Sequence, residues 1–229
     1  MVSNSKATEE KIYQVLHDAI LNAEFPPGQQ LKESSLAKAF GVSRTPVRTV
    51  FQRLKFDSLI ELIPKRGAFV YCPTPNEAQQ IFEMRKLLEP RATELAAIYA
   101  TDFEIQRMEA FLKKEKILIQ QKAFHQSLAA TKNFHLSIIE ASRNTFLIET
   151  LRKMISLSHI ILNYYDASEH KEANAISEHM ELLEAIRSRK PVVAKEMAHH
   201  HVSSIEEDVD FSKEYTHTVP VVQVIQKYL

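Results

Sequence analysis

Glycine occurs at only three positions, and all of them lie in the first third of the chain. They are Gly28, Gly41 and Gly67, so residues 68–229 contain no glycine. Glycine is the residue that most readily supplies tight turns and positive backbone φ angles. A long glycine-free stretch rich in Ala, Leu, Glu and Lys is therefore typical of helices joined by short connections.

A short proline-containing segment separates the two parts of the chain. It reads Pro73-Thr74-Pro75-Asn76, and we expect one domain over residues 1–72 and another over residues 73–229. The first holds ten Lys or Arg against seven Asp or Glu, and the second holds nineteen against twenty-two, so their charges of +3 and −3 cancel. This asymmetry is mild and is weak evidence for any polyanionic partner.

The composition is that of a folded soluble protein, with 45% hydrophobic and 25% charged residues. No apolar run approaches the roughly 20 residues that a membrane span needs, and the N-terminal segment lacks the apolar core of a secretory signal. A single cysteine, Cys72, excludes an internal disulfide framework and fits a reducing cytoplasm. We therefore expect a cytoplasmic protein without a membrane partner.

The first domain contains three segments with the features of helices. Residues 9–22 have apolar side chains every three or four positions. A shorter helix is predicted over residues 34–40, with Gly41 placed as its C-terminal glycine. Ser43 can cap the helix that follows, and Pro46 falls in its first turn, where the missing N–H costs little.

The third of these helices has two distinct faces. Its apolar stripe, spaced as one helix face, consists of Val47, Val50, Phe51 and Leu54. Arg44, Arg48 and Gln52 lie one turn apart on another face. Arginines on a single helix more often point into solvent than bind a partner, so this helix alone does not identify a function.

Two short strands follow this helix, over residues 59–63 and 68–72, and the turn Pro64-Lys65-Arg66-Gly67 between them is basic. Three helices followed by a basic-tipped hairpin predict a winged helix-turn-helix. In such a module the second helix of the pair enters the major groove of DNA.

Each polar position of this module has a predicted role. Arginine in the major groove can pair bidentately with guanine. Ser43, Thr45 and the free backbone N–H groups at the start of the helix can hold phosphates. We expect Lys65 and Arg66 of the wing to reach the neighbouring backbone or the minor groove.

The same residues carry a resemblance to a known family. IYQVLHDAIL, followed by FPPGQQLKESSLAKAFGVSRTPVRTVFQRLKFDSLIELIPKRGAFV, resembles the DNA-binding domain of the GntR family of bacterial repressors over almost all of residues 9–71. This resemblance is highly specific in one pattern, which consists of PPG, a leucine, LA, GVSRTPVR and a final leucine. The resemblance implies that Arg44, Thr45 and Arg48 contact DNA, with Gly67 at the wing tip.

Two positions depart from the family pattern. Ser34 stands where the family often has a basic residue, so its contact with DNA is expected to be weaker. Ser58 stands where the family usually has glycine, which alters the turn into the wing without abolishing it.

The second domain reads as an all-helical bundle. Thr74 to Glu77 fits a capping box with proline at the first helical position, and Pro90 should kink or restart the helix that follows. The stripe assigned to this helix is Ile81, Met84, Leu87 and Leu88. Further helical patterns occupy residues 102–121, 124–141, 145–165, 172–188 and 192–210. A further short helix is expected over the tail, residues 219–229. The whole fold is therefore expected to be mainly α, with a winged helix-turn-helix at its N-terminus and an all-helical bundle after it.

Histidines in this domain have the spacing of a metal site. His179 and His201 are each eleven residues from the break at Lys190-Pro191, so an antiparallel helical hairpin places them at the same height. Eleven residues are also close to three helical turns, so both can face one side. His135, on another helix, can complete a three-histidine set suited to Zn²⁺ or Ni²⁺, and His200 is an alternative ligand.

This domain also resembles a known one. IFEMRKLLEPRATELAA, NFHLSIIEAS and EHMELLEAIRSRKPVVAKEMAHHHV resemble the ligand-binding, FCD-type domain of the FadR subfamily of GntR proteins, over residues 76–202. The resemblance implies a six- or seven-helix effector domain that dimerises and often binds a metal and a small carboxylate. The subfamily's fourth metal ligand is Asp or Asn, and here that position is Thr131, a poor ligand.

Arg85 is the candidate anchor for an acidic effector. It lies next to Met84 and one turn before Glu89. An inward guanidinium can bind a carboxylate in bidentate fashion, whereas an i, i+4 salt bridge with Glu89 is the structural alternative.

These patterns favour a ligand-controlled transcription factor, with repression as the expected sign. A homodimer would place two recognition helices on a near-palindromic operator in double-stranded DNA, and a small carboxylate metabolite would change operator affinity. One alternative is a metal-dependent hydrolase tethered to DNA, although no motif places a general base and we expect no enzyme activity. Another is an architectural DNA protein without a ligand.

Overall fold

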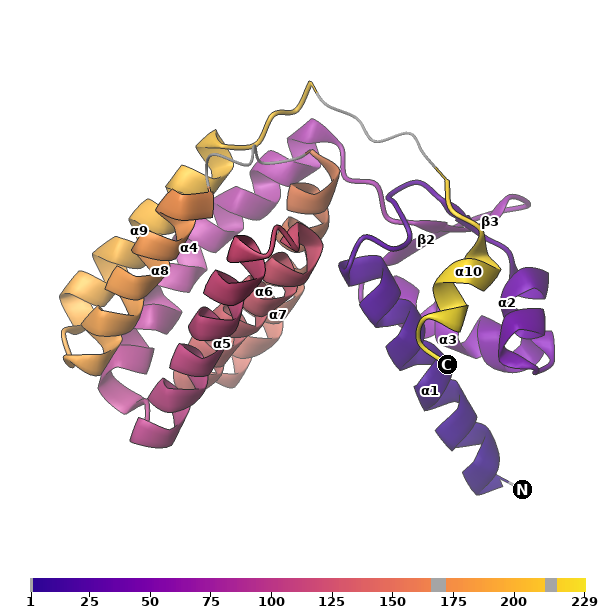
Figure 1. The fold of residues 1–229 in the computed structure, drawn as a ribbon, viewed down its shortest axis with the longest axis horizontal. Coiled ribbons are helices and arrows are strands. Elements are labelled where there is room, and N and C mark those ends of the chain that lie inside the picture. Colours follow the sequence, from indigo (N-terminus) through magenta and orange to yellow (C-terminus); the bar gives the residue numbers. More distant parts are fainter. Residues whose placement is uncertain (1, 166–171, 213–217) are drawn as a thin grey trace. The chain divides into compact units, whose positions relative to one another are not determined.

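The computed structural model describes residues 2–165, 172–212 and 218–229. Contacts divide the chain into two compact units, Met1–Pro73 with Glu214–Leu229, and Thr74–Lys213. The predicted grouping of 73–229 as one domain is thus wrong at its C-terminal end. There α10 (Val221–Gln226) packs against helices of the first unit, because its apolar side chains are buried there (Figure 1).

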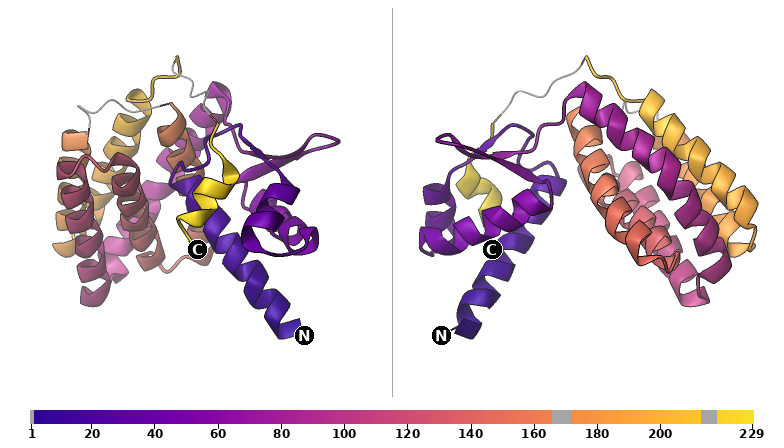
Figure 2. Two further views of the ribbon diagram at one scale, coloured as in Figure 1. Left: turned by 45° about the vertical axis from the view of Figure 1, so that its right-hand side comes forward. Right: turned by 180° about the vertical axis from the view of Figure 1, so that it is seen from behind.

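The first unit is a winged helix-turn-helix. Its elements before the tail are α1 (Val2–Leu21), β1 (Gln30–Leu31), α2 (Glu33–Phe40), α3 (Arg44–Phe56), β2 (Ile60–Ile63) and β3 (Gly67–Val70). The three strands form an antiparallel sheet in the order β1-β3-β2, with Ile63 opposite Gly67 in the β2-β3 hairpin. The hairpin projects from the unit as a wing (Figure 2). Strand β1 was not predicted, since two residues show no alternating pattern.

The turn between α2 and α3 depends on one glycine. Gly41 has φ 66° and ψ 33°, in the left-handed region that an L side chain adopts at a cost. Its N–H bonds to the carbonyl of Lys38, and the N–H of Val42 bonds to that of Ala37, which ends α2. A Cβ at this position would meet nothing within 4 Å, so the backbone angle alone requires glycine.

The second unit is a helical bundle. Its helices are α4 (Pro75–Tyr99), α5 (Asp102–Gln120), α6 (Phe124–Ala141), α7 (Thr145–Tyr164), α8 (Glu172–Arg187) and α9 (Pro191–Glu207). They lie side by side, and α4 contacts α6, α7, α8 and α9 (Figures 1 and 2). None of the helices in the described part of the chain is long and apolar enough to cross a membrane.

The first helix of the bundle has the predicted capping box, with the Glu77 N–H donating to Thr74 Oγ1 at 3.2 Å. It differs from its prediction in two other ways. The helix continues through Pro90 without restarting, because that residue is buried among neighbours whose packing outweighs one lost hydrogen bond. Met84 and Leu87, assigned to the buried stripe, are 40% and 65% exposed, and the buried face instead includes Arg85.

Candidate functional site

Helix α3 presents a polar face that is available to DNA. Its apolar stripe is buried as predicted, with Val47 and Leu54 fully covered. Arg44, Thr45 and Arg48 lie on the opposite side and are exposed. These side chains therefore contribute little to the core of the unit and are accessible to a ligand.

The start of α3 differs from its prediction. Ser43 occupies the N-cap position, with φ −72° and ψ 169°, but its side chain makes no capping hydrogen bond. Ser43 is exposed, and its hydroxyl does not satisfy the first backbone N–H groups of the helix. This arrangement leaves donors for a phosphate at a helix N-terminus, where the helix dipole also favours an anion.

Two neighbouring segments complete this face. Ser34, in the first turn of α2, is exposed, and the preceding Glu33 accepts a 2.8 Å bond from Arg48 Nε. The wing residues Lys65, Arg66 and Gly67 are also exposed. The wing is braced at its tip, where Gln30 Nε2 donates to the Arg66 carbonyl at 2.6 Å.

Three buried histidines from different helices converge in the second unit. His135 on α6, His179 on α8 and His201 on α9 are at most 3% exposed. His201 Nε2 lies 3.1 Å from His179 Nε2 and 3.2 Å from His135 Nε2. Among the described residues these three form a group whose ligand atoms all lie within 4.8 Å of one another.

The helical hairpin explains this convergence. Helix α8 ends at Arg187 and α9 begins at Pro191, so His179 and His201 face each other across the hairpin at the same height. His200, the proposed alternative ligand, is 72% exposed, because it lies about 100° around the helix from His201. The structure thus brings three histidines together and leaves His200 outside.

Each of the three histidines turns its Nδ1 atom toward a carboxylate. The pairs are His135 with Glu89 at 2.9 Å, His179 with Glu115 at 3.1 Å, and His201 with Glu178 at 2.7 Å. The first contact is close but not aligned as a regular hydrogen bond. Outer carboxylates of this kind orient metal-binding histidines and fix which ring nitrogen carries the proton.

This arrangement makes the Nε2 atoms electron-pair donors. An ionised carboxylate only accepts hydrogen bonds, so the Nδ1 atom that faces it carries the ring proton. The Nε2 lone pairs then face one another with no proton between them. Burial lowers the pKa of His201 well below its ordinary value, and His179 and His135 lower it further, so protonation does not relieve this contact near neutral pH.

A metal ion fits this set of donors. Tetrahedral zinc with Zn–N bonds of about 2.0–2.1 Å holds its nitrogens about 3.3 Å apart, close to the observed separations. Burial also lowers the pKa of His135, although Glu89 opposes that effect. Both histidines are thereby kept in the neutral form that binds metals.

The buried carboxylates remain ionised. Burial alone raises the pKa of Glu89, but Arg85 and His135 outweigh it and bring the pKa to about 2. Burial likewise raises the pKa of Glu115, and His179 with Thr131 reverses the shift, so the pKa is lowered. Burial raises the pKa of Glu178, which is only partly covered.

Thr131 contributes to the site through Glu115 and not through the histidines. Its hydroxyl contacts Glu115 Oε1, with the Ser127 carbonyl 3.1 Å away as the other acceptor. The other oxygen of Glu115 faces His179 Nδ1. Thr131 stands where the family pattern has a metal ligand, and it instead helps to hold an outer carboxylate in place.

Arg85 forms the salt bridge with Glu89 that was the structural alternative, and it keeps one further donor. Its side chain is 2% exposed, and its Nε donates to Glu89 Oε2 at 2.8 Å. Its Nη1 donates to Ser158 Oγ on α7 at 3.0 Å. Its Nη2 is buried and has no hydrogen-bond partner among the described residues. A buried guanidinium with a free donor is suited to an anion.

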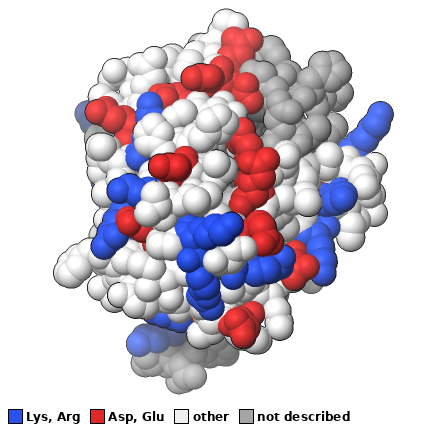
Figure 3. All heavy atoms as spheres, turned by 90° about the vertical axis from the view of Figure 1, so that its left-hand side faces the viewer, with Lys and Arg blue, Asp and Glu red and all other residues white. Residues whose placement is uncertain are grey.

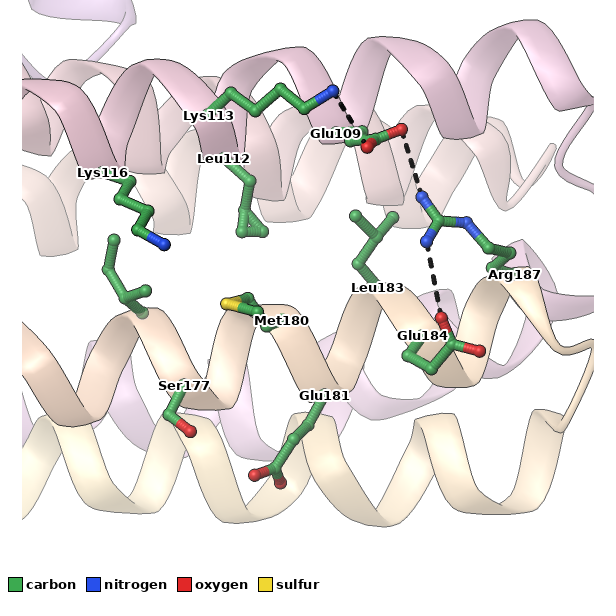
Figure 4. A pocket seen from close by; sticks show the side chains of 11 residues that line it. Glu109, Leu112, Lys113, Lys116, Ser177, Met180, Glu181, Leu183, Glu184 and Arg187 are labelled. Atoms are coloured by element: carbon green, nitrogen blue, oxygen red, sulfur yellow. Dashed lines mark hydrogen bonds and ion pairs between the residues drawn. The ribbon is translucent and has the colours of Figure 1, made fainter.

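A separate surface cleft of about 520 Å³ lies between α5 and α8 (Figure 4). Two of its cations are already paired, since Glu109 contacts Lys113 at 3.0 Å and Arg187 at 3.2 Å. The face of the molecule in Figure 3 also mixes acidic and basic side chains. Glu109, Glu181 and Glu184 also line the cleft and repel an acidic ligand, so the histidine group is the stronger candidate.

The sequence reasoning missed most of the outer residues of this group. Glu89 was considered only as a salt-bridge partner of Arg85, and it also contacts His135. Glu178 precedes a candidate ligand in the chain, which is a weak signal. Glu115 and Ser158 belong to other helices, and no local pattern connects them with the histidines.

Comparison with known proteins agrees with this architecture. Residues 8–70 match the family model for bacterial regulatory proteins of the gntR family, and residues 80–204, more than half of the chain, match the FCD domain. The chain is 29% identical over 189 residues to the HTH-type transcriptional regulator YdhC of Bacillus subtilis (strain 168), covering 81% of this chain and 84% of that protein.

Two more distant relatives cover most of the chain. The HTH-type transcriptional repressor RspR of Escherichia coli (strain K12) is 22% identical, with 90% of each chain covered. A GntR transcriptional regulator from Rhodococcus sp. RHA1 has a similar fold, with TM-score 0.78, 20% identity and coverage of 88% of this chain and 96% of that chain.

The matched families and relatives are transcriptional regulators and not enzymes, and none supports a DNA-tethered hydrolase. An N-terminal GntR domain followed by an FCD domain implies DNA binding coupled to regulation. The chain therefore belongs to the GntR family of bacterial transcriptional regulators, with an FCD domain as its second unit.

Proposed function

We propose that this GntR-family regulator is a repressor whose operator affinity responds to a small carboxylate bound at a metal centre in the FCD domain. The observation that carries the proposal is the convergence of three buried histidine Nε2 atoms whose Nδ1 atoms all face carboxylates. Such a set of lone pairs has no good internal partner and favours a cation.

His135, His179 and His201 would hold a divalent transition metal, with Zn²⁺ or Ni²⁺ suited to imidazole donors. When bound, the ion supplies a Lewis-acidic position for a ligand oxygen. The charges nearby support this assignment. Glu89 and Glu115 are buried and ionised, Arg85 is the buried cation beside them, and a divalent ion offsets the remaining negative charge.

Arg85 would bind the carboxylate of the effector. Its free Nη2 atom is buried, and the same side chain is tied through Glu89 to His135. Glu89 contacts Arg85 with one oxygen and His135 with the other. It therefore fixes the position of Arg85, the proposed anion anchor, relative to His135, a proposed metal ligand. A ligand that contacts both the ion and Arg85 is consequently a small molecule with an acidic group.

The DNA-binding residues would be Arg44, Thr45 and Arg48 at the base edges and backbone. Ser43 and Ser34 would contact phosphates, and Lys65, Arg66 and Gly67 would form the wing contact. Their exposure supports these roles. A regulator that contacts an operator in this way acts where the chromosome lies, in the bacterial cytoplasm.

We also expect a homodimer, since a near-palindromic operator requires two recognition helices. The exposed side of α4 supports it: Met84, Leu87 and Ile98 are 40%, 65% and 49% exposed and follow one another along one side of the helix. Apolar side chains aligned in this way are suited to burial against a second copy. Repression is supported by the name of the relative RspR, a transcriptional repressor.

The first experiment is elemental analysis of the untagged protein, followed by fluorescence anisotropy with DNA from its own upstream region. We expect about one transition metal per chain, and salt-sensitive binding that prefers this DNA over random sequence. Mono-, di- and tricarboxylates are then titrated into the complex, and at least one should release the DNA.

The outcomes separate the parts of the proposal. A metal-free protein, even after incubation with Zn²⁺ or Ni²⁺, contradicts the metal centre. A metal-loaded protein whose DNA binding no carboxylate changes contradicts the effector class. Binding without preference for the upstream DNA contradicts operator recognition there.

A further inference from the structure

The segment between α1 and β1, residues 22–29, is bonded at both of its ends to the C-terminal stretch of the chain, residues 218–229. Three side chains of the segment each bind a residue of that stretch. The pairs are Asn22 with Tyr228 at 3.2 Å, Glu24 with Lys227 at 2.5 Å, and Gln29 with Val219 at 2.9 Å. The start of the segment thus meets the end of the C-terminal stretch, so the two run antiparallel.

Helix α10 packs on the unit through two buried side chains of this stretch. It contacts α2 most and α1 next (Figure 1). Val224 and Ile225 are 3% and 0% exposed, whereas Val222, on the opposite side of the helix, is 40% exposed. A helix of six residues is not stable alone in water, so it forms because it packs against the unit.

Gln29 links the C-terminal stretch to the wing. Its side chain is 5% exposed and binds Val219 twice, with Nε2 donating to the carbonyl and Oε1 accepting from the N–H. Its own backbone carbonyl accepts from the Val70 N–H of β3 at 2.9 Å, and the Gly28 N–H donates to the Val70 carbonyl at 2.9 Å. One residue therefore contacts the C-terminal stretch with its side chain and the wing strand with its backbone.

The next residue extends this support to the tip of the wing. Gln30 pairs with Phe69 of β3, and its Nε2 donates to the Arg66 carbonyl at 2.6 Å. Strand β1 has only two residues, and so short a strand has little stability of its own. Its place beside β3 therefore depends on what holds residues 28–30.

We propose that residues 218–229 are a positioning element of the wing. Docked on residues 22–29, they hold Gln29 and with it β1 against β3, so that Lys65 and Arg66 keep the position from which they contact DNA. The inference rests on the proposed wing contact and adds the part of the chain that supports it. Every contact that it uses lies within the first unit.

The decisive variant is Val224→Asp in the full-length chain. Burying a carboxylate at this position is costly, so the C-terminal stretch should undock. Hydrogen exchange of the Gly28 and Val70 amides, which join residues 28–29 to β3, then reports the wing, and the amides of α3 are an internal reference. We expect the two wing amides to exchange about tenfold faster, with α3 changed by less than about twofold. Val222→Asp, the same substitution at an exposed position, should leave these rates unchanged.

DNA binding tests the functional part of the inference. Val224→Asp should weaken binding to the upstream DNA about tenfold and lower the slope of log affinity against log salt by about 1 to 2, because wing contacts with phosphates are lost. It should have no further effect in a Lys65→Ala, Arg66→Ala background, since that background already lacks the wing contact. In an Arg44→Ala background the two losses should multiply, because α3 acts independently of the wing.

Unchanged exchange of the Gly28 and Val70 amides in Val224→Asp would overturn the positioning role. So would α3 exchange that rises as much as theirs, since the variant would then loosen the whole unit. An affinity loss that is undiminished in the Lys65→Ala, Arg66→Ala background would also overturn it, because the stretch would then act through another part of the unit. If that background itself binds DNA like the parent, the proposed wing contact fails instead, and the exchange of the two wing amides still decides the positioning role.

Discussion

The DNA-binding face and the histidine centre are built in opposite ways. The residues proposed to contact bases lie within a few positions of one another at the start of α3, and all are exposed. The histidines come from three helices, with His135 and His201 separated by 66 positions in the chain, and all are buried. One site is a surface that meets its partner from outside, whereas the other is enclosed by the fold.

The difference determines how each site responds to mutation. An exposed arginine has few internal contacts, so its loss should change binding with little effect on stability. A buried histidine and its carboxylate form one network, so loss of the histidine would remove a proposed metal ligand and leave a polar partner unsatisfied.

The largest effect is expected for His201→Ala. His201 is the residue whose Nε2 lies near both other histidines, at 3.1 and 3.2 Å. Its removal leaves two ligands, so metal content should fall from about one per chain to less than about a tenth, as measured by elemental analysis. His200→Ala is the matched control, because that neighbour is exposed and should retain the metal. Equal metal in both variants would show that the trio is not the site.

The next effect concerns the exposed face. Arg44→Ala should weaken binding to upstream DNA by about ten- to a hundredfold, since a bidentate arginine–guanine contact contributes about 1–3 kcal/mol. The melting temperature should change little. Arg152→Ala, an exposed arginine of the helical unit, is the control at the same salt concentration. Unchanged anisotropy titrations for Arg44→Ala would remove this residue from the interface.

A smaller effect is expected for the outer carboxylates. Glu115→Gln should lower zinc affinity about tenfold, because it removes the ionised partner of His179 Nδ1 while preserving side-chain size. Chelator competition measures the change. Thr131→Val keeps the carboxylate and removes only the hydroxyl that contacts it, so its loss should be smaller. If Thr131→Val is the more damaging variant, Thr131 contributes to metal binding more directly than its contacts indicate.

The smallest effect is expected in the turn between α2 and α3. Gly41→Ala should reduce the unfolding free energy of the DNA-binding unit by about 1–2 kcal/mol, because alanine is strained at φ 66° although its Cβ has open space. Gly41→Asn tolerates this conformation better and should lose less. Urea denaturation distinguishes the two variants. Equal stability of wild type and Gly41→Ala would show that the turn relaxes without cost.

The sequence predicted features that depend on near neighbours. The break at Ser142 to Asn144 and the helix over 145–165 agree with α7, Thr145–Tyr164, because spacing and capping act within a few residues. His179 and His201 were correctly predicted to lie at the same height for the same reason, because a hairpin with a short turn aligns residues that are equidistant from the turn. Ser43 was placed correctly as the N-cap residue, but its side chain does not cap.

The errors concern contacts between distant segments. Strand β1 exists because it pairs with β3, and two residues have no pattern of their own. Met84 and Leu87 were assigned to the core because helical spacing identifies an apolar stripe but not what covers it. The C-terminal helix was predicted, but its packing on the first unit was not, because no pattern within residues 219–229 indicates which surface buries it.

By itself, the sequence determined the winged helix-turn-helix, the helical bundle and the matched heights of His179 and His201, because turn chemistry and periodicity are local. Only the tertiary structure decided that His135 joins these two histidines and that Glu89, Glu115 and Glu178 face the trio. It also buried Arg85 with one donor, Nη2, that has no partner within the described part of the chain. It also decided that the tail docks on the DNA-binding unit. Hydrogen bonds and burial join residues that are far apart in the chain, and periodicity does not record those pairings.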